Sequence, residues 1–252
     1  MEKALKRIVI VGATSKIAEH VARIWVTEGD YVIMLIGRDL TSLESIAADL
    51  TVRGRPQTKV EVISTTFTSP ENIKILVDNV ASGGTPDIVL IAHGSLPDQA
   101  LCETDLVVLA NTLLVNGTSV CLLAEGFAGL MQGRGTGQIA VFGSVAGDRG
   151  RKSNYAYGAA KGLVETYLQG MEHRFGRSEI IISLIKPGPT ATPMTANLAA
   201  TGIKMANVEA VAANIVLGLS KRRPVIYVPF KWALIMAVIR ILPRFIFNRM
   251  QI

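Results

Sequence analysis

Residues 7–18, RIVIVGATSKIA, join an apolar run to a glycine turn and then to an amphipathic pattern that continues to about Glu28. The run at residues 7–11 predicts a buried strand, and the 3.6-residue period after it predicts a helix. In this order the free backbone N–H groups and the dipole of the helix both point at the turn, which suits an anion. Gly12 is the only glycine of the turn, so an ordinary strand-to-helix turn is the alternative.

The same alternation of short apolar runs and helical patterns continues along the chain. Further strands are predicted at residues 31–36, 59–64, 87–92, 138–142, 179–185 and 225–228, and helices at 40–52, 70–80, 103–131, 153–175 and 208–220. Strands that alternate with helices of this length favour a parallel, doubly wound sheet with helices on both faces and right-handed crossovers. We therefore expect one α/β domain over residues 1–229, followed by a basic, apolar tail at 230–252 that is not a separate domain.

Length and composition are those of an ordinary α/β domain. The chain has 252 residues, 49% of them hydrophobic, and 23 glycines, which suits buried parallel strands and tight turns. The first apolar run is too short for a secretory signal. Cys102 and Cys121 are the only cysteines, and their spacing matches neither a metal site nor a redox motif. We expect a cytoplasmic protein with two reduced, buried cysteines and no metal.

Positive charge is concentrated at the C-terminal end. The net charge is +6, yet no acid follows Glu209, whereas seven Lys and Arg residues occur from Lys221 onward. The rest of the chain is close to neutral. The basic residues are interleaved with aliphatic side chains and lack an exposed aromatic platform, which disfavours a nucleic-acid partner.

Residues 143–162, GSVAGDRGRKSNYAYGAAKG, carry a pattern suited to proton transfer. Tyr157 and Lys161 are four residues apart, so on a helix they share one face. A tyrosine has an ordinary pKa near ~10, and a nearby cation favours its phenolate, so the side chain can give and retake a proton. Ser144 follows a predicted strand at the edge where that proton would be used. Such a Tyr–Lys pair is common by chance and needs support from other motifs.

Several motifs in a fixed order over residues 7–228 supply that support, and the chain resembles the short-chain dehydrogenases/reductases. The motifs are the turn at residues 12–18, Ala92-His93-Gly94, Asn116, Ser144, Tyr157 and Lys161 thirteen and seventeen residues after Ser144, and Pro187-Gly188 with Thr192. The resemblance implies a single-domain Rossmann-type fold. It also implies an NAD(P)-dependent oxidoreductase that transfers a hydride between nicotinamide and a carbonyl or secondary alcohol.

The resemblance also implies a role for each motif residue. Tyr157 would be the general acid in carbonyl reduction, and Lys161 would lower its pKa and bond the nicotinamide ribose. Ser144 would hold the carbonyl oxygen, and Asn116 would position a water that joins Lys161 to solvent. The expected cofactor-binding residues are Gly12, Thr14, Ser15, Lys16, Ile17, Arg38, Thr66, Phe67, Ala92, His93, Gly94, Tyr157, Lys161, Pro187, Gly188, Thr190 and Thr192.

Cofactor choice depends on the end of the second strand. An NAD-selective enzyme usually has an acid there, but this chain has Gly37 followed by Arg38. A guanidinium at that place suits a 2′-phosphate, so NADP is favoured and NAD remains possible. Lys16 either adds to this preference or is a solvated charge.

Three features depart from the family's pattern. Lys16 and Ala18 stand where the turn usually has glycines, and Thr66 stands where an acid usually meets the adenine. The family's usual Asn-Asn-Ala-Gly run is Ile91-Ala92-His93-Gly94 here, and His93 either faces the cofactor ribose or is a hydrogen-bonded structural histidine. These departures concern cofactor binding and leave the catalytic residues intact.

The loop at residues 190–206 and the tail are the places where the substrate would be recognised. The loop is predicted to be a mobile cover over the substrate. The tail, with Trp232 and Phe247 beside Arg and Lys, is too short to span a bilayer, and it either lies in the interface of an anionic membrane or packs between subunits of a homodimer or homotetramer. It resembles the tails of bacterial reductases of polyprenyl-phosphate-linked keto sugars, such as the decaprenylphosphoryl-2-keto-ribose reductases, which implies an apolar or lipid-linked substrate.

The rival interpretation is a non-catalytic dinucleotide-binding sensor or partner-binding subunit. Retention of Asn116, Ser144, Tyr157 and Lys161 together argues against it.

Overall fold

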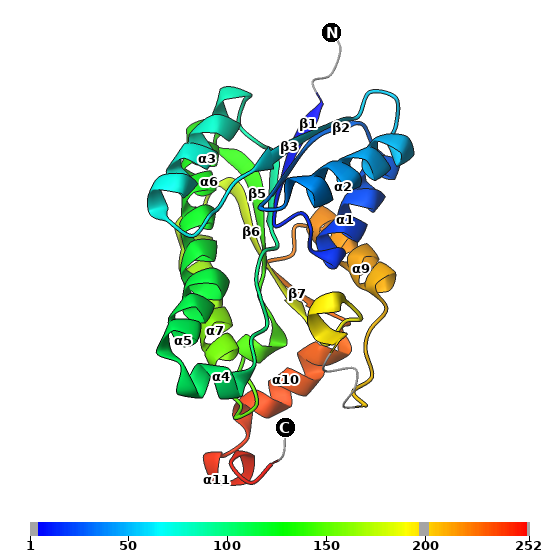
Figure 1. Ribbon diagram of the computed structural model, residues 1–252. Helices are drawn as coiled ribbons and strands as arrows, with labels where there is room; N and C mark the ends of the chain where they lie inside the picture. The colour runs from blue at the N-terminus through cyan, green and yellow to red at the C-terminus, as the bar shows by residue number, and fades with distance from the viewer. Residues whose placement is uncertain (1–4, 197–201, 251–252) are drawn as a thin grey trace.

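A seven-stranded parallel sheet is the centre of the computed structural model, which describes residues 5–196 and 202–250 (Figure 1). Its strands are β1 Lys6–Val11, β2 Tyr31–Gly37, β3 Lys59–Ser64, β4 Ile88–Ile91, β5 Thr136–Phe142, β6 Glu179–Pro187 and β7 Val225–Val228. They are arranged in the order β3-β2-β1-β4-β5-β6-β7. The predicted doubly wound α/β fold is therefore confirmed.

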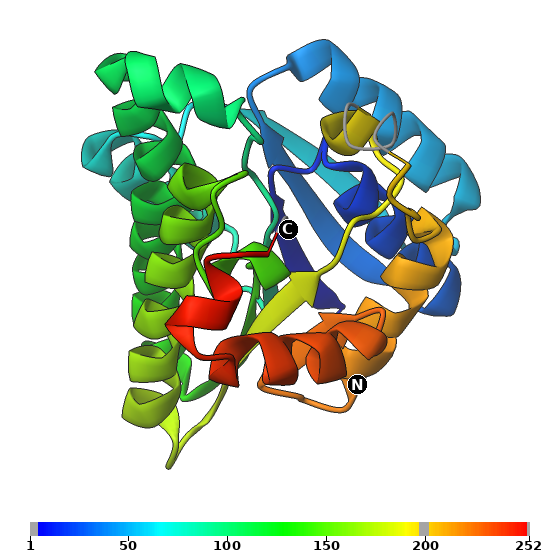
Figure 2. The same ribbon diagram turned by 90° about the horizontal axis from the view of Figure 1, so that it is seen from below.

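Two layers of helices cover the sheet. Figures 1 and 2 show α1 Lys16–Glu28, α2 Leu40–Arg53 and α9 Val208–Ser220 on one face, and α3 Pro70–Ser82, α6 Ser119–Arg134 and α7 Tyr155–Phe175 on the other. The remaining helical segments are α4 Gln99–Thr104, α5 Leu106–Leu113, the π-helical turn η1 Leu114–Thr118, the short turns η2 Val145–Gly147 and η3 Pro193–Thr195, α10 Lys231–Ile241 and α11 Arg244–Phe247.

The inner strands of the sheet are mainly apolar because both of their faces are buried, whereas the edge strand β3 is partly exposed. In β1, Val9 and Val11 belong to the core under α3, α6 and α7, whereas Ile8 and Ile10 belong to the core under α1, α2 and α9. Successive side chains of a strand point to opposite faces, so a strand between two helical layers reads as a continuous apolar run. This is why the short runs of the sequence predict the sheet so well.

The strand order reverses beside β1, which fixes the place of the site. The chain runs from β1 outward to β3 and then returns to β4, which pairs with the other side of β1. At such a switch point the loops beyond the carboxyl ends of the two strands diverge and leave a crevice. Gly12 and Ala92 come directly after these two strands, so the motifs of the sequence meet there.

The long helix predicted at residues 103–131 is wrong as a single element, because it is divided into α4, α5, η1 and α6. Asp105 starts a new helix, since its carboxylate accepts hydrogen bonds from the N–H groups of Val107 (2.8 Å) and Val108 (3.2 Å). At Asn116 the helix takes the π-helical turn η1. By length and composition the helical run Leu106–Arg134 could cross a bilayer, but α6 within it is a core helix against the sheet.

The tail forms two helices at the carboxyl edge of the sheet. Figures 1 and 2 show α10 and α11 across this edge, at the end of the molecule opposite the start of β1. Met236 is the buried residue of α10, and the Trp232 indole lies so close to Gly188 that a Cβ there would be 2.0 Å from Trp232 Nε1. Arg149 fixes the far end by donating hydrogen bonds to the carbonyl oxygens of Ile239 (2.5 Å) and Leu242 (2.7 Å).

Candidate active site

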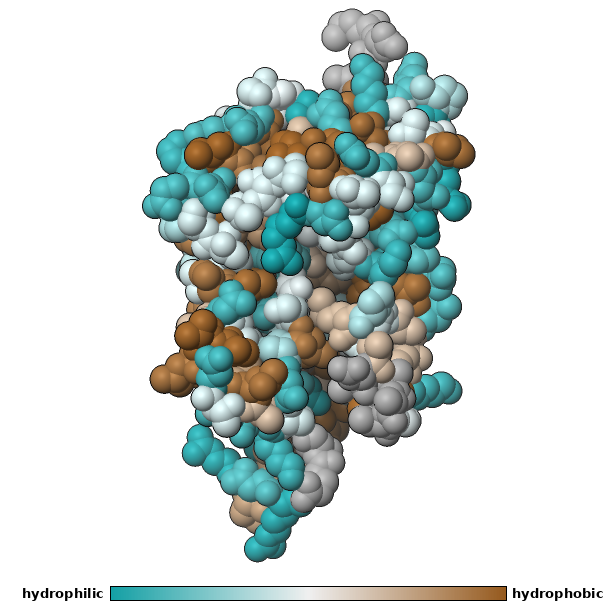
Figure 3. Space-filling model, viewed as in Figure 1, coloured by the Kyte–Doolittle hydropathy of each residue, from teal (hydrophilic) through white to brown (hydrophobic). Residues whose placement is uncertain are grey.

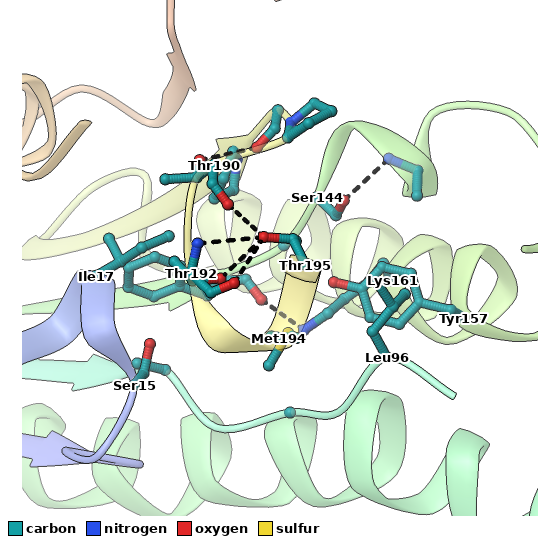
Figure 4. Close-up of a pocket in the computed structure, with 18 of the residues that line it drawn as sticks. Ser15, Ile17, Leu96, Ser144, Tyr157, Lys161, Thr190, Thr192, Met194 and Thr195 are labelled. Atoms are coloured by element: carbon teal, nitrogen blue, oxygen red, sulfur yellow. Dashed lines mark hydrogen bonds between the residues drawn. The ribbon is translucent and has the colours of Figure 1, made fainter. Parts of the chain in front are cut away.

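A cleft of about 1190 Å³, its open mouth included, lies at the carboxyl ends of the strands. Figure 4 shows side chains entering it from three directions: Ser15 and Ile17 from the β1–α1 turn, Tyr157 and Lys161 from α7, and Thr190 to Thr195 from the segment after β6. The cavity volume inside the cleft is about 290 Å³, which suits a small ligand.

The β1–α1 turn provides the anion site. Gly12 has φ +79°, and a Cβ there would lie 2.4 Å from His93 N, so only glycine allows the turn to approach the end of β4. Thr14, Ser15, Lys16 and Ile17 line the cleft directly after it, at the N-terminus of the 13-residue helix α1. The first N–H groups of a helix have no partner within it, which leaves them free for a phosphate.

Ser144 is held at the end of β5 by the packing of η2 against α7. Its Oγ accepts a hydrogen bond from Ala146 N (3.1 Å). A Cβ on Gly158 would lie 2.8 Å from Ala146 O, so the small residue on α7 lets the two segments approach. This close packing within the chain sets Ser144 opposite Tyr157.

Tyr157 and Lys161 lie on the same face of α7 and both enter the cleft (Figure 4). The Lys161 Nζ is 5.8 Å from the centroid of the Tyr157 ring, as their spacing predicts. The ammonium is 3% exposed and donates a hydrogen bond to the carbonyl oxygen of Phe142 (2.8 Å). This bond anchors Lys161 to the end of β5, next to Ser144.

Burial controls the protonation of both groups. It raises the pKa of Tyr157 to about 12, and the hydrogen bond with Ser144 acts in the opposite direction. It lowers the pKa of Lys161 to about 8, an effect that Cys121 partly offsets. The expectation that Lys161 brings down the pKa of Tyr157 is therefore not met in the protein alone, because burial of the phenol dominates and the cation is directed at Phe142. At neutral pH the phenol is protonated and can act as an acid.

Asn116 lies behind the cleft wall. Its Oδ1 accepts a hydrogen bond from Ser95 N (2.8 Å), and its Nδ2 donates one to Thr112 O (3.0 Å). A Cβ on Gly94 would lie 2.8 Å from Asn116 Oδ1 and 3.8 Å from Lys161 Nζ. Glycine at position 94 therefore keeps a small space open between the amide and the ammonium, which suits the predicted water link.

His93 is held as a structural histidine on one side and borders the cleft on the other. Its Nε2 is 2.8 Å from Ser119 Oγ, and the ring meets Phe67 edge-on with centroids 4.6 Å apart, so one side is structural. Its Nδ1 is buried without a hydrogen-bond partner while the residue lines the cleft. Burial, with the charges of Lys161 and Arg38, lowers the pKa of His93 to about 3, so the ring is neutral. An orphan nitrogen beside the phosphate turn fits a bound nucleotide.

Most of the expected cofactor residues line this cleft, but five of the site residues predicted from the sequence do not. Those brought together are Thr14, Ser15, Lys16, Ile17, Ala92, His93, Gly94, Ser144, Tyr157, Lys161, Pro187, Gly188, Thr190 and Thr192. The others are Gly12, Arg38, Thr66, Phe67 and Asn116. Arg38 is exposed beyond β2, and Thr66 is exposed and accepts a hydrogen bond from Asn72 (2.8 Å). Phe67 supports His93 from behind.

Sequence reasoning missed other lining residues. Among them are Leu96, Arg151 and Asn154, whereas Met194 and Thr195 fall in the loop at residues 190–206 that the sequence predicts to cover the substrate. Arg151 and Asn154 fall inside the quoted stretch at 143–162, but no motif marks them. Thr195 organises the segment after β6, since its hydroxyl donates to Thr190 O (2.5 Å) and accepts from Thr192 N (3.3 Å), as Figure 4 shows. Part of the predicted cover, residues 197–201, lies outside the described residues.

Comparison with known proteins agrees with this geometry. Residues 6–202 match the family model described as short chain dehydrogenase. The chain is 28% identical to an uncharacterized oxidoreductase of Streptomyces coelicolor, over 98% of this chain and 96% of that protein. It is 27% identical to an uncharacterized oxidoreductase of Mycobacterium tuberculosis, over 96% of each.

Solved structures share the fold. A short-chain dehydrogenase from Sphingobium yanoikuyae in complex with NADPH superposes with a TM-score of 0.82 at 21% identity, over 95% of this chain and 97% of that one. The bulky-bulky ketone specific alcohol dehydrogenase from Comamonas testosteroni superposes with a TM-score of 0.80 at 19% identity, over 96% of each chain.

Proposed function

Because the chain belongs to the short-chain dehydrogenase family, a family of nicotinamide-dependent oxidoreductases that act on CH–OH and C=O groups, we propose that it is an NADP-preferring carbonyl reductase. The observation that carries the proposal is the meeting of Ser144, Tyr157 and Lys161 in one cleft, beside the phosphate turn of α1.

The chain's own residues would act on the substrate oxygen. Bound nicotinamide would supply the hydride. The Tyr157 hydroxyl is protonated at neutral pH and would give its proton to the carbonyl oxygen, which the Ser144 hydroxyl would hold by a hydrogen bond. Lys161 would stabilise the phenolate that Tyr157 leaves, since its ammonium lies on the same face of the helix. The space beside Gly94 would let a proton return to Tyr157 through water and Lys161.

NADP preference is supported by Arg38. Its side chain is exposed and makes no hydrogen bond or ion pair within residues 5–196 and 202–250. The next residue, Asp39, does not offer a free carboxylate to a ribose, because it caps α2 by accepting from Ser42 N (3.1 Å) and Ser42 Oγ (2.6 Å). One neighbour in fold, the short-chain dehydrogenase from Sphingobium yanoikuyae, was solved in complex with NADPH. Lys16 gives weaker support, since Glu19 holds its ammonium at 2.7 Å.

The substrate is proposed to be apolar or lipid-linked, with the tail as a contact to an anionic membrane at the inner, cytoplasmic face. On α10, α11 and the residue before α10, the large apolar side chains Phe230, Leu234, Ile235, Val238, Ile241, Phe245 and Ile246 are exposed. They lie at the carboxyl edge of the sheet beside Lys231, Arg240 and Arg244, and no acid follows Glu209 in the chain. Exposed apolar groups with basic neighbours suit an anionic lipid surface.

Flotation with vesicles tests this contact in the full chain. The wild type should float with phosphatidylglycerol vesicles and stay behind with phosphatidylcholine vesicles, whereas Leu234→Asp with Phe245→Asp should not float with either. Val52→Asp, on an even more exposed position of α2, is the control and should float normally. If the wild type stays behind, or if the tail variant only dissociates an oligomer, the tail is not a membrane contact.

A homodimer or homotetramer is also proposed, as is common in the family. Brown, apolar side chains gather over α4 and α5 in Figure 3, where Leu101, Leu106, Val107 and Leu113 are exposed. Burial of such a patch between copies would stabilise an oligomer. Sedimentation equilibrium should give a mass of two or four chains.

The reductase itself is tested by the oxidation of NADPH and NADH with a panel of ketones, lipid-linked keto sugars included, and by identification of the products. Formation of an alcohol, with a higher kcat/KM for NADPH, is the expected result. No observation in the structure favours the sensor interpretation, which predicts nucleotide binding without turnover.

A further inference from the structure

The cleft is positively charged in a way that the cofactor alone does not explain. Three cations, Lys16, Arg151 and Lys161, line it, and no Asp or Glu occurs among the described residues of the lining. Lys16 is paired with Glu19, and Lys161 donates to Phe142 O. Both of these belong to the proposed nucleotide and catalytic groups. Arg151 is the cation left over.

The charged guanidinium of Arg151 has no partner in the part of the chain that the structure describes. It is half-buried in the loop between η2 and α7, and its Nε is buried without a hydrogen-bond partner. Over residues 5–196 and 202–250 its guanidinium makes no hydrogen bond and no ion pair. Burial lowers the pKa of Arg151, and the charge of Asp148 only partly opposes this effect. The Asp148 carboxylate is itself occupied, because it pairs with Lys186 and accepts from the Tyr227 hydroxyl at 3.1 Å.

Arg149, in the same loop, has a structural role and provides a comparison for Arg151. Arg149 does not line the cleft, and its guanidinium bonds the carbonyl oxygens of Ile239 and Leu242 and lies 3.8 Å from the Phe247 ring centroid. Its donors are therefore used to hold the tail. Arg151, two residues later, is directed into the cleft with its donors unused. A partly buried cation is costly unless it is paired, so the fold keeps this one at a cost in stability.

A second polar group beside Arg151 is also unsatisfied. Asn154 lines the same cleft, and its Oδ1 is buried without a hydrogen-bond partner. Asn154 precedes Tyr157 by three residues, and both Arg151 and Asn154 lie between the two residues that would hold the substrate oxygen, Ser144 and Tyr157. Unpaired buried donors and acceptors at one place in a cleft are the signature of a binding site whose ligand completes them.

We infer that Arg151 is a substrate-binding residue and that the substrate carries an anionic group, a carboxylate or a phosphate, near the carbonyl that is reduced. The guanidinium fork matches two oxygens of either group, and Asn154 is placed for a neighbouring hydroxyl or amide of the substrate. The inference rests on the proposed reductase function and adds the substrate class to it.

Binding measured without turnover is the first test. A ketone carboxylate and dihydroxyacetone phosphate, each with its uncharged counterpart (the methyl ester and dihydroxyacetone), are titrated calorimetrically into the full-length enzyme saturated with NADP. The wild type should bind at least one anionic probe about 100-fold more tightly than its neutral counterpart. Arg151→Gln should lose this preference, and Arg151→Lys should keep part of it. The better-bound anion tells carboxylate from phosphate.

Matched controls separate recognition from damage to the fold. Arg149→Gln removes the same charge from the same loop outside the cleft and should leave the anionic-to-neutral ratio unchanged. Arg151→Gln should bind NADPH as the wild type does. If neither anion is preferred by the wild type, or if Arg151→Gln weakens charged and neutral probes equally, the inference is overturned.

Turnover then separates this inference from the reductase proposal. With active substrates, Arg151→Gln should lower kcat/KM about 100-fold for the anionic ketone and less than about threefold for its ester. If the wild type shows Arg151-dependent anion binding but reduces no ketone of the panel, the anion site stands and the reductase function fails.

Discussion

Lys186 and Asp148 form an ion pair in which neither side chain is exposed to solvent beyond 1%. Glu165 joins it, with Oε2 2.8 Å from Lys186 Nζ. The three residues come from the three elements of the catalytic centre: Asp148 follows Ser144 by four residues, Glu165 follows Lys161 by one helical turn, and Lys186 precedes Pro187. The cluster therefore ties together the parts that position Ser144, Lys161 and the nicotinamide end of the cleft.

Lys186→Met should destabilise the fold and lower activity together. It leaves the Asp148 carboxylate buried without its counter-charge, which costs about 3–5 kcal/mol of the free energy of unfolding. Although burial alone would lower the pKa of Lys186, the bonds to Asp148 and Glu165 raise it, so the pair is charged in the fold. Urea unfolding measures the loss. Lys74→Met, which removes an exposed pair with Asp78, should cost less than about 1 kcal/mol, and equal losses would refute the role of the buried cluster.

Arg38→Gln should reduce the preference for NADPH over NADH. The exposed guanidinium has no partner of its own in the described part of the chain, and its loss removes a charge-assisted bond to a 2′-phosphate. We expect the ratio of kcat/KM values for NADPH and NADH to fall about tenfold. Arg53→Gln, at the other end of α2, should leave the ratio unchanged. A wild type that prefers NADH, or a ratio insensitive to Arg38, would contradict the assignment.

The pH profile should reflect Lys161 rather than Tyr157. The pKa of Tyr157, raised to about 12, keeps the acid protonated throughout the neutral range, whereas Lys161, with its pKa lowered to about 8, loses its charge above that pH. The kcat/KM for NADPH, which reports on the free enzyme, should be level below about pH 8 and fall above it. Lys161→Met should be slow, without this descending limb. A wild-type profile that stays level to about pH 10 would exclude Lys161 as the titrating group.

His93 should make the fold sensitive to acid. Burial lowers its pKa from 6.5 to about 3, so between these values the unfolded chain binds a proton that the folded protein does not. Stability therefore falls as the pH drops through this window, by up to ~5 kcal/mol from this residue. In urea unfolding, His93→Gln should lose less stability than the wild type between about pH 6.5 and 4. His173→Gln, at an exposed position of α7, should behave as the wild type does, and an unchanged acid response in His93→Gln would disprove the prediction.

Most of the fold and the catalytic group could be predicted from the local sequence. The strands were predictable because a strand between two helical layers is apolar on both faces, as the alternation of Ile8 and Val9 between the two cores shows. Tyr157 and Lys161 were predictable because their spacing places both side chains on one face of a helix, and Ser144 was predictable because it follows a predicted strand. The expected reduced, buried state of both cysteines is likewise confirmed.

The features that escaped prediction depend on contacts between distant residues. The division of the helix at residues 103–131 rests on Asp105 as a cap and on the bond between Ser95 and Asn116, which are 21 residues apart. Arg149 and Arg151 look alike in the sequence, and only the position of the tail tells which one is occupied. Burial of the Tyr157 ring, whose effect on the pKa outweighs that of the hydrogen bond with Ser144, also comes from tertiary packing.

Transfer of deuterium from the reactive face of labelled NADPH to a ketone, followed by mass spectrometry of the alcohol, tests the central claim most directly. The wild type should place deuterium on the former carbonyl carbon. Tyr157→Phe should bind NADPH equally well but form product at least ~100-fold more slowly, because it lacks the proton donor. Product without deuterium, or undiminished turnover by Tyr157→Phe, would contradict the account.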